Sequence, residues 1–296
     1  IIFSTLHIIF SIIFGVFFFI DTKSQKSISL KFALAAIFFM IFSSLGPFSL
    51  GPIVTMGLKN SIWYNLAIYF YLHFQYNGWF LFTILSLTLF QINKFDKDNW
   101  QRAFNLFFIS TLLNFSLSTL WTNPGWVINI ISVLSALMQL HALFLMSKDF
   151  ITYFNTLDNA KSYVYKIVFA LFALKVFFSL IGSIQEVALY VYYNRNLVIG
   201  YLHLIFLGVV TPFFFQQIAN DLHLNPKNKY KRAMLIYFVF FLISEILLGL
   251  SSIGLRGDTI ILISDWLVYT TWLLAGITLH IIVYFIRENF HTSIED

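Results

Sequence analysis

The sequence predicts an all-α protein, a polytopic transmembrane helix bundle with about nine spans, and three observations support this fold class. Hydrophobic residues make up 59% of the chain and charged residues only 10%, too little charge to cover a soluble protein of 296 residues. Apolar runs of about 18 residues or more recur from end to end, each long enough to cross a bilayer as a helix. The runs do not alternate with a period of two, which disfavours a β-barrel.

Polar residues divide the chain into nine predicted spans, which together form one transmembrane domain over residues 1–296. The connections are short and polar, so no loop is expected to hold a soluble domain. The chain begins without Met inside an apolar run, so we expect that it lacks N-terminal helices. The predicted spans are approximately 1–20, 32–57, 62–90, 103–121, 125–147, 163–189, 197–219, 233–253 and 260–286.

Basic residues predict the orientation of these spans. Of the 18 Lys and Arg residues, only Lys59, Arg195 and Arg256 fall in even-numbered connections, and Lys175 lies near the middle of the sixth span. The other 14 lie in or beside the odd-numbered connections and the C-terminal tail, which the positive-inside rule places in the cytoplasm. We therefore expect the first residue outside and the C-terminus in the cytoplasm. The lipid bilayer is the expected environment, and no nucleic-acid-binding footprint is present.

Two short segments predict irregular backbone. Gly46-Pro47-Phe48-Ser49-Leu50-Gly51-Pro52 lies within the second span, where the prolines remove backbone donors and predict a kink or a break. Trp121-Thr122-Asn123-Pro124-Gly125 predicts a tight turn between the fourth and fifth spans. A broken helix is also a feature of substrate sites in transporters.

The third and seventh spans share a motif that contains histidine. His73 and His203 each end a Tyr-Leu-His triplet, the second beginning at Tyr201, and each is followed after five residues by Gly78 or Gly208. Ionisable side chains inside a membrane favour a functional interpretation. One alternative is ligation of haem iron by both histidines, with the glycines letting a flat macrocycle approach the backbone. The other is hydrogen bonding and close packing between helices.

This repeated motif resembles the haem–copper oxidase subunit I superfamily, including divergent NnrS-type and oxidase subunit I-like membrane proteins. The resemblance implies a twelve-helix bundle in which the third and seventh spans here match the sixth and tenth helices. His203 would then match a haem ligand, and His73 a residue beside a second metal centre. It also implies haem b, a bacterial inner membrane location, and other membrane or respiratory subunits as partners.

Two departures from the family pattern limit what the resemblance implies. Tyr201 stands where the catalytic oxidases have a further histidine on the tenth helix, and the span from Ala103 to Trp121 has no histidine for a second metal. Copper or non-haem iron is therefore left open. A haem b-binding relative with a respiratory, nitric-oxide-response or electron-transfer role fits better than an oxygen or nitric oxide reductase.

Charged residues inside the spans support a rival hypothesis. Lys175, Glu245 and Asp265 lie within the sixth, eighth and ninth spans. They could form a proton path, or they could be interhelical ion pairs that compensate buried charge. Together with the Gly46–Pro52 break, a polar path would indicate a transporter or channel. The absence of Cys excludes disulfides and thiolate metal sites.

Overall fold

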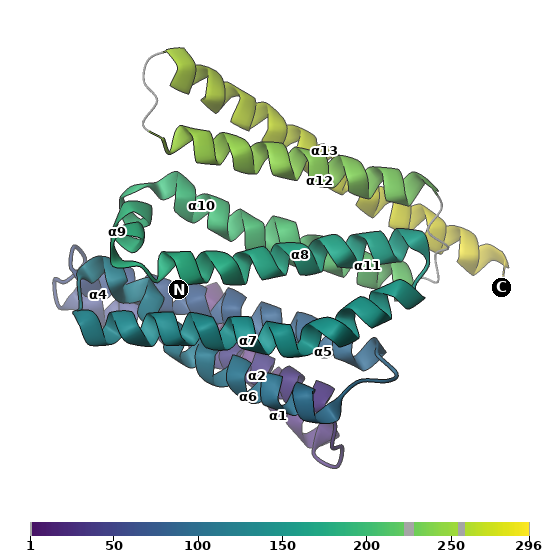
Figure 1. The fold of residues 1–296 in the computed structure, drawn as a ribbon, viewed down its shortest axis with the longest axis horizontal. Coiled ribbons are helices and arrows are strands. Elements are labelled where there is room, and N and C mark those ends of the chain that lie inside the picture. The colour runs from purple at the N-terminus through teal and green to yellow at the C-terminus, as the bar shows by residue number, and fades with distance from the viewer. Residues whose placement is uncertain (1, 222–227, 254–257, 296) are drawn as a thin grey trace. The chain divides into compact units, whose positions relative to one another are not determined.

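The computed structural model is helical wherever it has regular structure in the residues that it describes, 2–221, 228–253 and 258–295 (Figure 1). The α-helices are α1 (Ile2–Thr22), α2 (Ile28–Ser43), α3 (Leu45–Thr55), α4 (Ile62–His73), α5 (Leu81–Gln91), α6 (Lys97–Leu113), α7 (Trp126–Thr156), α8 (Asn159–Gly182), α9 (Gln185–Tyr193), α10 (Arg195–His203), α11 (Thr211–Asp221), α12 (Asn228–Ser251) and α13 (Asp258–Glu295). The other elements are two π-helices, η1 (Phe74–Phe80) and η3 (Leu204–Val210), and a 3₁₀-helix, η2 (Asn114–Thr122).

The helices confirm a multi-pass membrane protein. Among the described residues, eight helical segments are long and apolar enough to cross a membrane. The third predicted span, 62–90, forms one uninterrupted helical segment from Ile62 to Gln91 but is not among the eight. The polar residues that follow His73 make its centre less apolar. The count of nine spans therefore stays a prediction, as does the orientation, and Arg256 lies outside the described residues.

Two predicted boundaries differ from the structure. The fifth span was expected to end near residue 147, but α7 continues to Thr156, because a helix need not end at the membrane surface. The sixth was expected over 163–189, but α8 ends at Gly182 and α9 begins at Gln185. Tight turns close the gap, with Ser183 N donating to Leu180 O and Ile184 N to Ile181 O.

The interruption expected in the second span is present. α2 ends at Ser43 and α3 begins at Leu45, so a single residue separates them. Pro47 has no N–H to donate to the carbonyl of Ser43 four residues earlier, which explains the position of the break. The turn predicted at residues 121–125 is also present, with positive φ at Asn123 (54°) and Gly125 (98°).

The chain forms two compact units, residues 1–150 with 176–189, and residues 151–175 with 190–296. In the first unit, α2 packs against η1, α5 and α6. Its core is aromatic: Phe32, Phe39, Phe82 and Phe107 are fully buried, and ring centroids lie 5.2 Å apart for Phe39–Phe82 and 5.4 Å for Phe82–Phe107.

In the second unit, α12 packs against α13, α10 and η3 (Figure 1). Tyr237 and Met234 of α12 are fully buried, and Phe285 of α13 contacts Phe215 of α11, with ring centroids 6.1 Å apart. This packing brings α12 against η3, the π-helix of the seventh predicted span.

The order of elements repeats along the chain. The α4–η1–α5 segment begins at Ile62 and is followed by α6, and the α10–η3–α11 segment begins at Arg195 and is followed by α12. In both segments a π-helix of seven residues separates two α-helices. The motif repeat detected in the sequence thus corresponds to a repeat of local structure.

Candidate functional site

Both motif histidines occupy the same place in the backbone. His73 is the last residue of α4 and His203 the last of α10, and each is followed at once by a π-helix. A π turn widens the helix and leaves backbone groups and side chains out of the regular α-helical register, and such turns occur frequently at functional sites. The two positions are therefore the first candidates for a site.

The motif glycines pack against phenylalanine rings of neighbouring helices. A Cβ placed on Gly78 would lie 2.5 Å from the Cβ of Phe39 on α2. A Cβ on Gly208 would lie 2.8 Å from the ring of Phe241 on α12 and 3.3 Å from Leu171 on α8. Each glycine thus provides close helix packing, as the second interpretation of the motif expected. A role for either glycine beside a macrocycle stays a prediction.

The ring nitrogens of His73 both contact protein groups. Nε2 lies 2.9 Å from the carbonyl oxygen of Thr111 on α6, and Nδ1 lies 3.1 Å from the amide nitrogen of Asn77. Since a carbonyl can only accept, Nε2 carries the proton and Nδ1 accepts from Asn77. The side chain is 2% exposed and lies against the rings of Phe74 and Phe115. In this conformation neither nitrogen is available to a metal ion.

His203 has different surroundings. Its Nδ1 lies 3.3 Å from Oε1 of Glu245 on α12, an ion-pair distance without the alignment of a hydrogen bond. Both atoms are buried and have no other hydrogen-bond partner among the described residues. Gly200 makes room for the carboxylate, since a Cβ there would lie 3.2 Å from Glu245 Oε2.

The other ring nitrogen of His203, Nε2, makes no hydrogen bond to any described residue. About a third of the side chain, 36%, is accessible. His203 therefore combines a carboxylate at one nitrogen with an accessible second nitrogen. Of the two motif histidines, His203 is therefore the one whose ring nitrogen could bind a ligand.

Further polar contacts tie α9 and α10 to α12 on either side of this pair. Asn196 donates to Ser251 Oγ over 2.8 Å, and the Tyr190 hydroxyl donates to the Ser252 carbonyl over 2.8 Å. Beyond His203, the hydroxyl of Tyr237 donates to the carbonyl of Leu207 inside η3 over 2.7 Å. These bonds hold the helix that carries His203 against the helix that carries Glu245.

The other residues singled out in the sequence differ in their exposure and contacts. Lys175 is fully buried on α8, whereas the side chain of Asp265 is exposed on α13. Tyr201 is half-buried on α10, two residues before His203. Glu245, expected in an ion pair or a proton path, contacts His203. In the part of the chain that the structure describes, no three His, Asp or Glu side chains are grouped closely enough to hold a metal ion.

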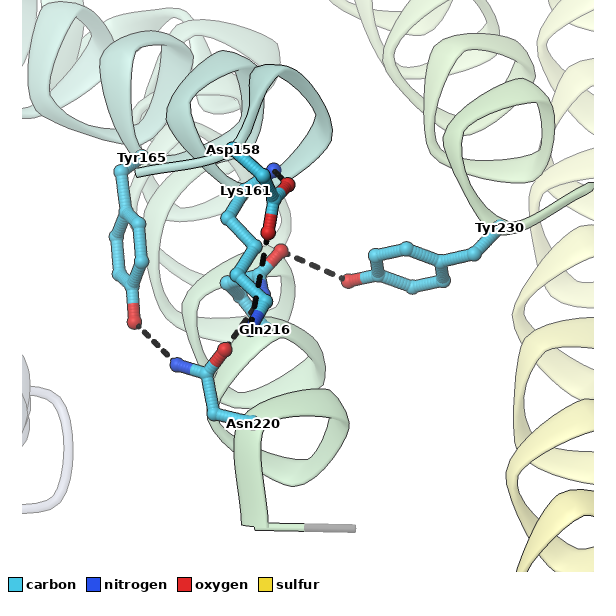
Figure 2. A network of polar contacts seen from close by, with 6 residues as sticks. All are labelled: Asp158, Lys161, Tyr165, Gln216, Asn220 and Tyr230. Carbon is cyan, nitrogen blue, oxygen red and sulfur yellow. Dashed lines mark hydrogen bonds and ion pairs between the residues drawn. The ribbon is translucent and has the colours of Figure 1, made fainter. Parts of the chain in front are cut away.

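Sequence reasoning missed a buried polar network in the second unit (Figure 2). Asn220 donates to the Tyr165 hydroxyl over 3.0 Å, Gln216 donates to Asn220 over 3.1 Å, and the Tyr230 hydroxyl donates to Gln216 over 3.4 Å. The amide of Gln217 also donates to Tyr165, over 3.1 Å. The spacing of Gln216, Gln217 and Asn220 at one helical turn in an otherwise apolar span was the available signal. The network joins α8, α11 and α12.

Comparisons with protein-family models, with curated proteins and with solved structures found no match to the chain.

Proposed function

We propose that this multi-pass membrane protein binds haem b, and that His203 would be the residue that holds its iron. The observation that carries the proposal is the pair of contacts at one imidazole: a carboxylate at Nδ1 and an accessible Nε2. Histidines that ligate metals generally present their second nitrogen to a carboxylate or a carbonyl, which fixes the ring and raises its basicity. Neutral imidazole is a common axial ligand of haem iron.

The proposal assigns different roles to the two motif histidines. His203 would supply the ligand and Glu245 would orient it, with Gly200 leaving space for the carboxylate. His73 would hold α4 to α6 through Thr111, because ligation would require it to break a buried hydrogen bond. This departs from the two-histidine site that the family resemblance implies.

When bound, haem would supply reversible one-electron redox chemistry. The chain's own contribution would be electrostatic. The Glu245 carboxylate beside Nδ1 would favour electron donation by the imidazole, and its negative charge would lower the reduction potential of a bound haem. This chemistry is compatible with a respiratory, nitric-oxide-response or electron-transfer role, as the resemblance to oxidase subunit I-like proteins suggests. A copper or non-haem iron centre beside His73 is not included, because the grouping of side chains it needs is absent from the described residues.

An absorption spectrum tests the proposal. Protein purified from haem-replete cells should show a Soret band, which His203→Ala should abolish. His73→Ala, if it folds, should retain the band, and so should His280→Ala, whose side chain is exposed on α13. Glu245→Gln should retain haem and raise its reduction potential. A colourless wild-type preparation, or a Soret band that survives His203→Ala, would refute the proposal.

A proton-coupled transporter is the second candidate, and the same pair favours it. A histidine in contact with a carboxylate inside a span is the kind of side-chain pair that forms proton relays in transporters. The polar path expected from the sequence included Asp265 and the break near Gly46, and this site needs neither. The side chain of Asp265 is exposed, and Gly46 packs against the Ala67 carbonyl of α4. Colourless protein that acidifies liposomes in a solute-dependent way, and that loses this flux in Glu245→Gln, would support it.

A further inference from the structure

A groove in the first unit plays no part in the proposed haem site. It has a volume of about 830 Å³ and lies between α1, α2 and the η1–α5 segment. Each of these helices contributes one face to it, with side chains spaced at about one helical turn. Representative lining residues are Phe14 and Phe18 of α1, Ala33 and Ile37 of α2, and Leu87 and Phe90 of α5.

The groove exists because α1 meets α2 closely at one point. Gly15 of α1 allows this contact, since a Cβ there would lie 3.0 Å from Ile37 and 3.1 Å from Ile41. Large apolar side chains on the walls remain uncovered: Phe10 is 65% exposed and Phe90 80% exposed. Within a membrane, such walls are covered by hydrocarbon.

One end of the groove is polar. Thr22, Gln25, Ser27 and Ser29 line it where α1 ends and α2 begins. Across the groove from α1, Ser29 and Ser86 bind each other, each hydroxyl donating to the other's carbonyl over 2.9 and 2.8 Å. Elsewhere the walls are mostly apolar: Ser11 and Thr83 donate to carbonyls of their own helical segments, and His7 lies near the start of α1. A largely apolar groove with hydroxyl and amide groups at one end matches a molecule with a hydrocarbon chain and a polar head.

The net charge at this polar end is positive, because Lys23 and Lys26 outnumber the single carboxylate of Asp21. Lys23 and Lys26 flank Gln25 in the connection between α1 and α2, and both side chains are exposed. No Asp or Glu lies between Asp21 and Asp96 in the sequence. Lysines at the membrane surface attract anionic lipid headgroups.

We propose that this groove binds an anionic phospholipid, with an acyl chain between α1, α2 and α5 and the phosphate beside Lys23 and Lys26. The volume lies within the range of about 300–1,000 Å³ typical of small-molecule sites. The two lysines select the phospholipid by charge, and the apolar faces retain its chain. This site belongs to the first unit, whereas His203 and Glu245 belong to the second.

Native mass spectrometry of the purified full chain in detergent tests the proposal, by titration with phosphatidylglycerol and with phosphatidylcholine of the same acyl composition. Wild-type protein should bind phosphatidylglycerol at least tenfold more tightly. The double variant Lys23→Gln/Lys26→Gln should reduce this preference to within about twofold, since each surface lysine contributes about fivefold to anionic lipid binding. Ala33→Trp should fill the groove and weaken the binding of both lipids.

Two matched controls separate the groove from general effects. Lys59→Gln removes a charge from a different connection, and Leu134→Trp enlarges an exposed side chain on α7. Both should leave the preference unchanged. Equal affinity of wild type for the two lipids, or an unchanged preference in the double lysine variant, would overturn the proposal even if Ala33→Trp fails to fold. Loss of the Soret band on His203→Ala would be independent of these results.

Discussion

The carboxylate of Asp149 on α7 accepts a 2.8 Å hydrogen bond from the indole nitrogen of Trp100 on α6. Oδ2 of the same carboxylate also accepts from the backbone N–H of Asp96, over 3.1 Å. Asp96 in turn caps α6 by accepting from the N–H groups of Asp98 and Asn99. One carboxylate thus fixes the start of α6 to α7.

Replacement of Asp149 should therefore destabilise the first unit. Asp149→Ala leaves the indole N–H of the fully buried Trp100 without its acceptor, and hydrogen bonds to charged groups contribute about 1.5–3 kcal/mol. Thermal unfolding in detergent should show the loss. As a control, Asp158→Asn removes the charge from a partly exposed 3.8 Å pair with Lys161, while the amide oxygen of Asn can still accept from the Lys161 N–H; the loss should be under about 1 kcal/mol.

The motif glycine of the first π-helix should not tolerate a methyl group. Gly78→Ala would place its Cβ 2.5 Å from Phe39, and overpacking of a core costs about 1–3 kcal/mol. Gly51→Ala on α3 meets no atom within 4 Å and should be neutral or slightly stabilising, because alanine favours helices. Unfolding of the two variants in parallel measures the difference, and equal stabilities would contradict the packing role of Gly78.

In the second unit, the Tyr165 hydroxyl should contribute more to stability than the Tyr230 hydroxyl. Tyr165→Phe removes the acceptor of two amide groups, from Gln217 and Asn220, and an unsatisfied buried donor costs about 1–3 kcal/mol. Tyr230→Phe removes a single long bond of 3.4 Å to Gln216. A larger loss of thermal stability in Tyr230→Phe would contradict the network drawn in Figure 2.

His73 should be neutral and protonated at Nε2. Its contacts to the Thr111 carbonyl and the Asn77 amide together allow only this tautomer. Nitrogen NMR of histidine-labelled protein should show one ring that carries its proton at Nε2 and not at Nδ1, and the signals of this ring should disappear in His73→Gln. A His73 ring that carries its proton at Nδ1 would contradict the assignment.

The elements that the sequence predicted well are those set by composition and by single residues. The apolar runs indicated the membrane helices, the Gly46–Pro52 segment indicated an interruption of the second span, and the repeated motif indicated two equivalent positions. These signals are local: the length of an apolar run, a missing N–H, a recurring triplet. They need no knowledge of which helices become neighbours.

The contacts of the site could not be predicted in this way, because they depend on helix pairing. The sequence placed His203 and Glu245 in different spans without indicating that α10 and α12 pack together. It also did not distinguish His73, whose nitrogens are both engaged, from His203. The π-helices were missed because no residue pattern used in the prediction separates them from α-helix.

The two π-helices also change the rotation of the helices that contain them. A π turn takes about one residue more than an α turn, so the residues after it are rotated by about 100° relative to an uninterrupted helix. The side of α5 that packs against α2 is therefore rotated about the helix axis relative to the side that would follow on from α4 in an uninterrupted α-helix. Deletion of one residue between Phe74 and Phe80 would restore regular α-helix, yet it would turn Leu81 and Phe82, both fully buried, away from their present neighbours. The length of each π-helix therefore sets the rotation of the α-helix that follows it, and so decides which side of that α-helix packs against its neighbours.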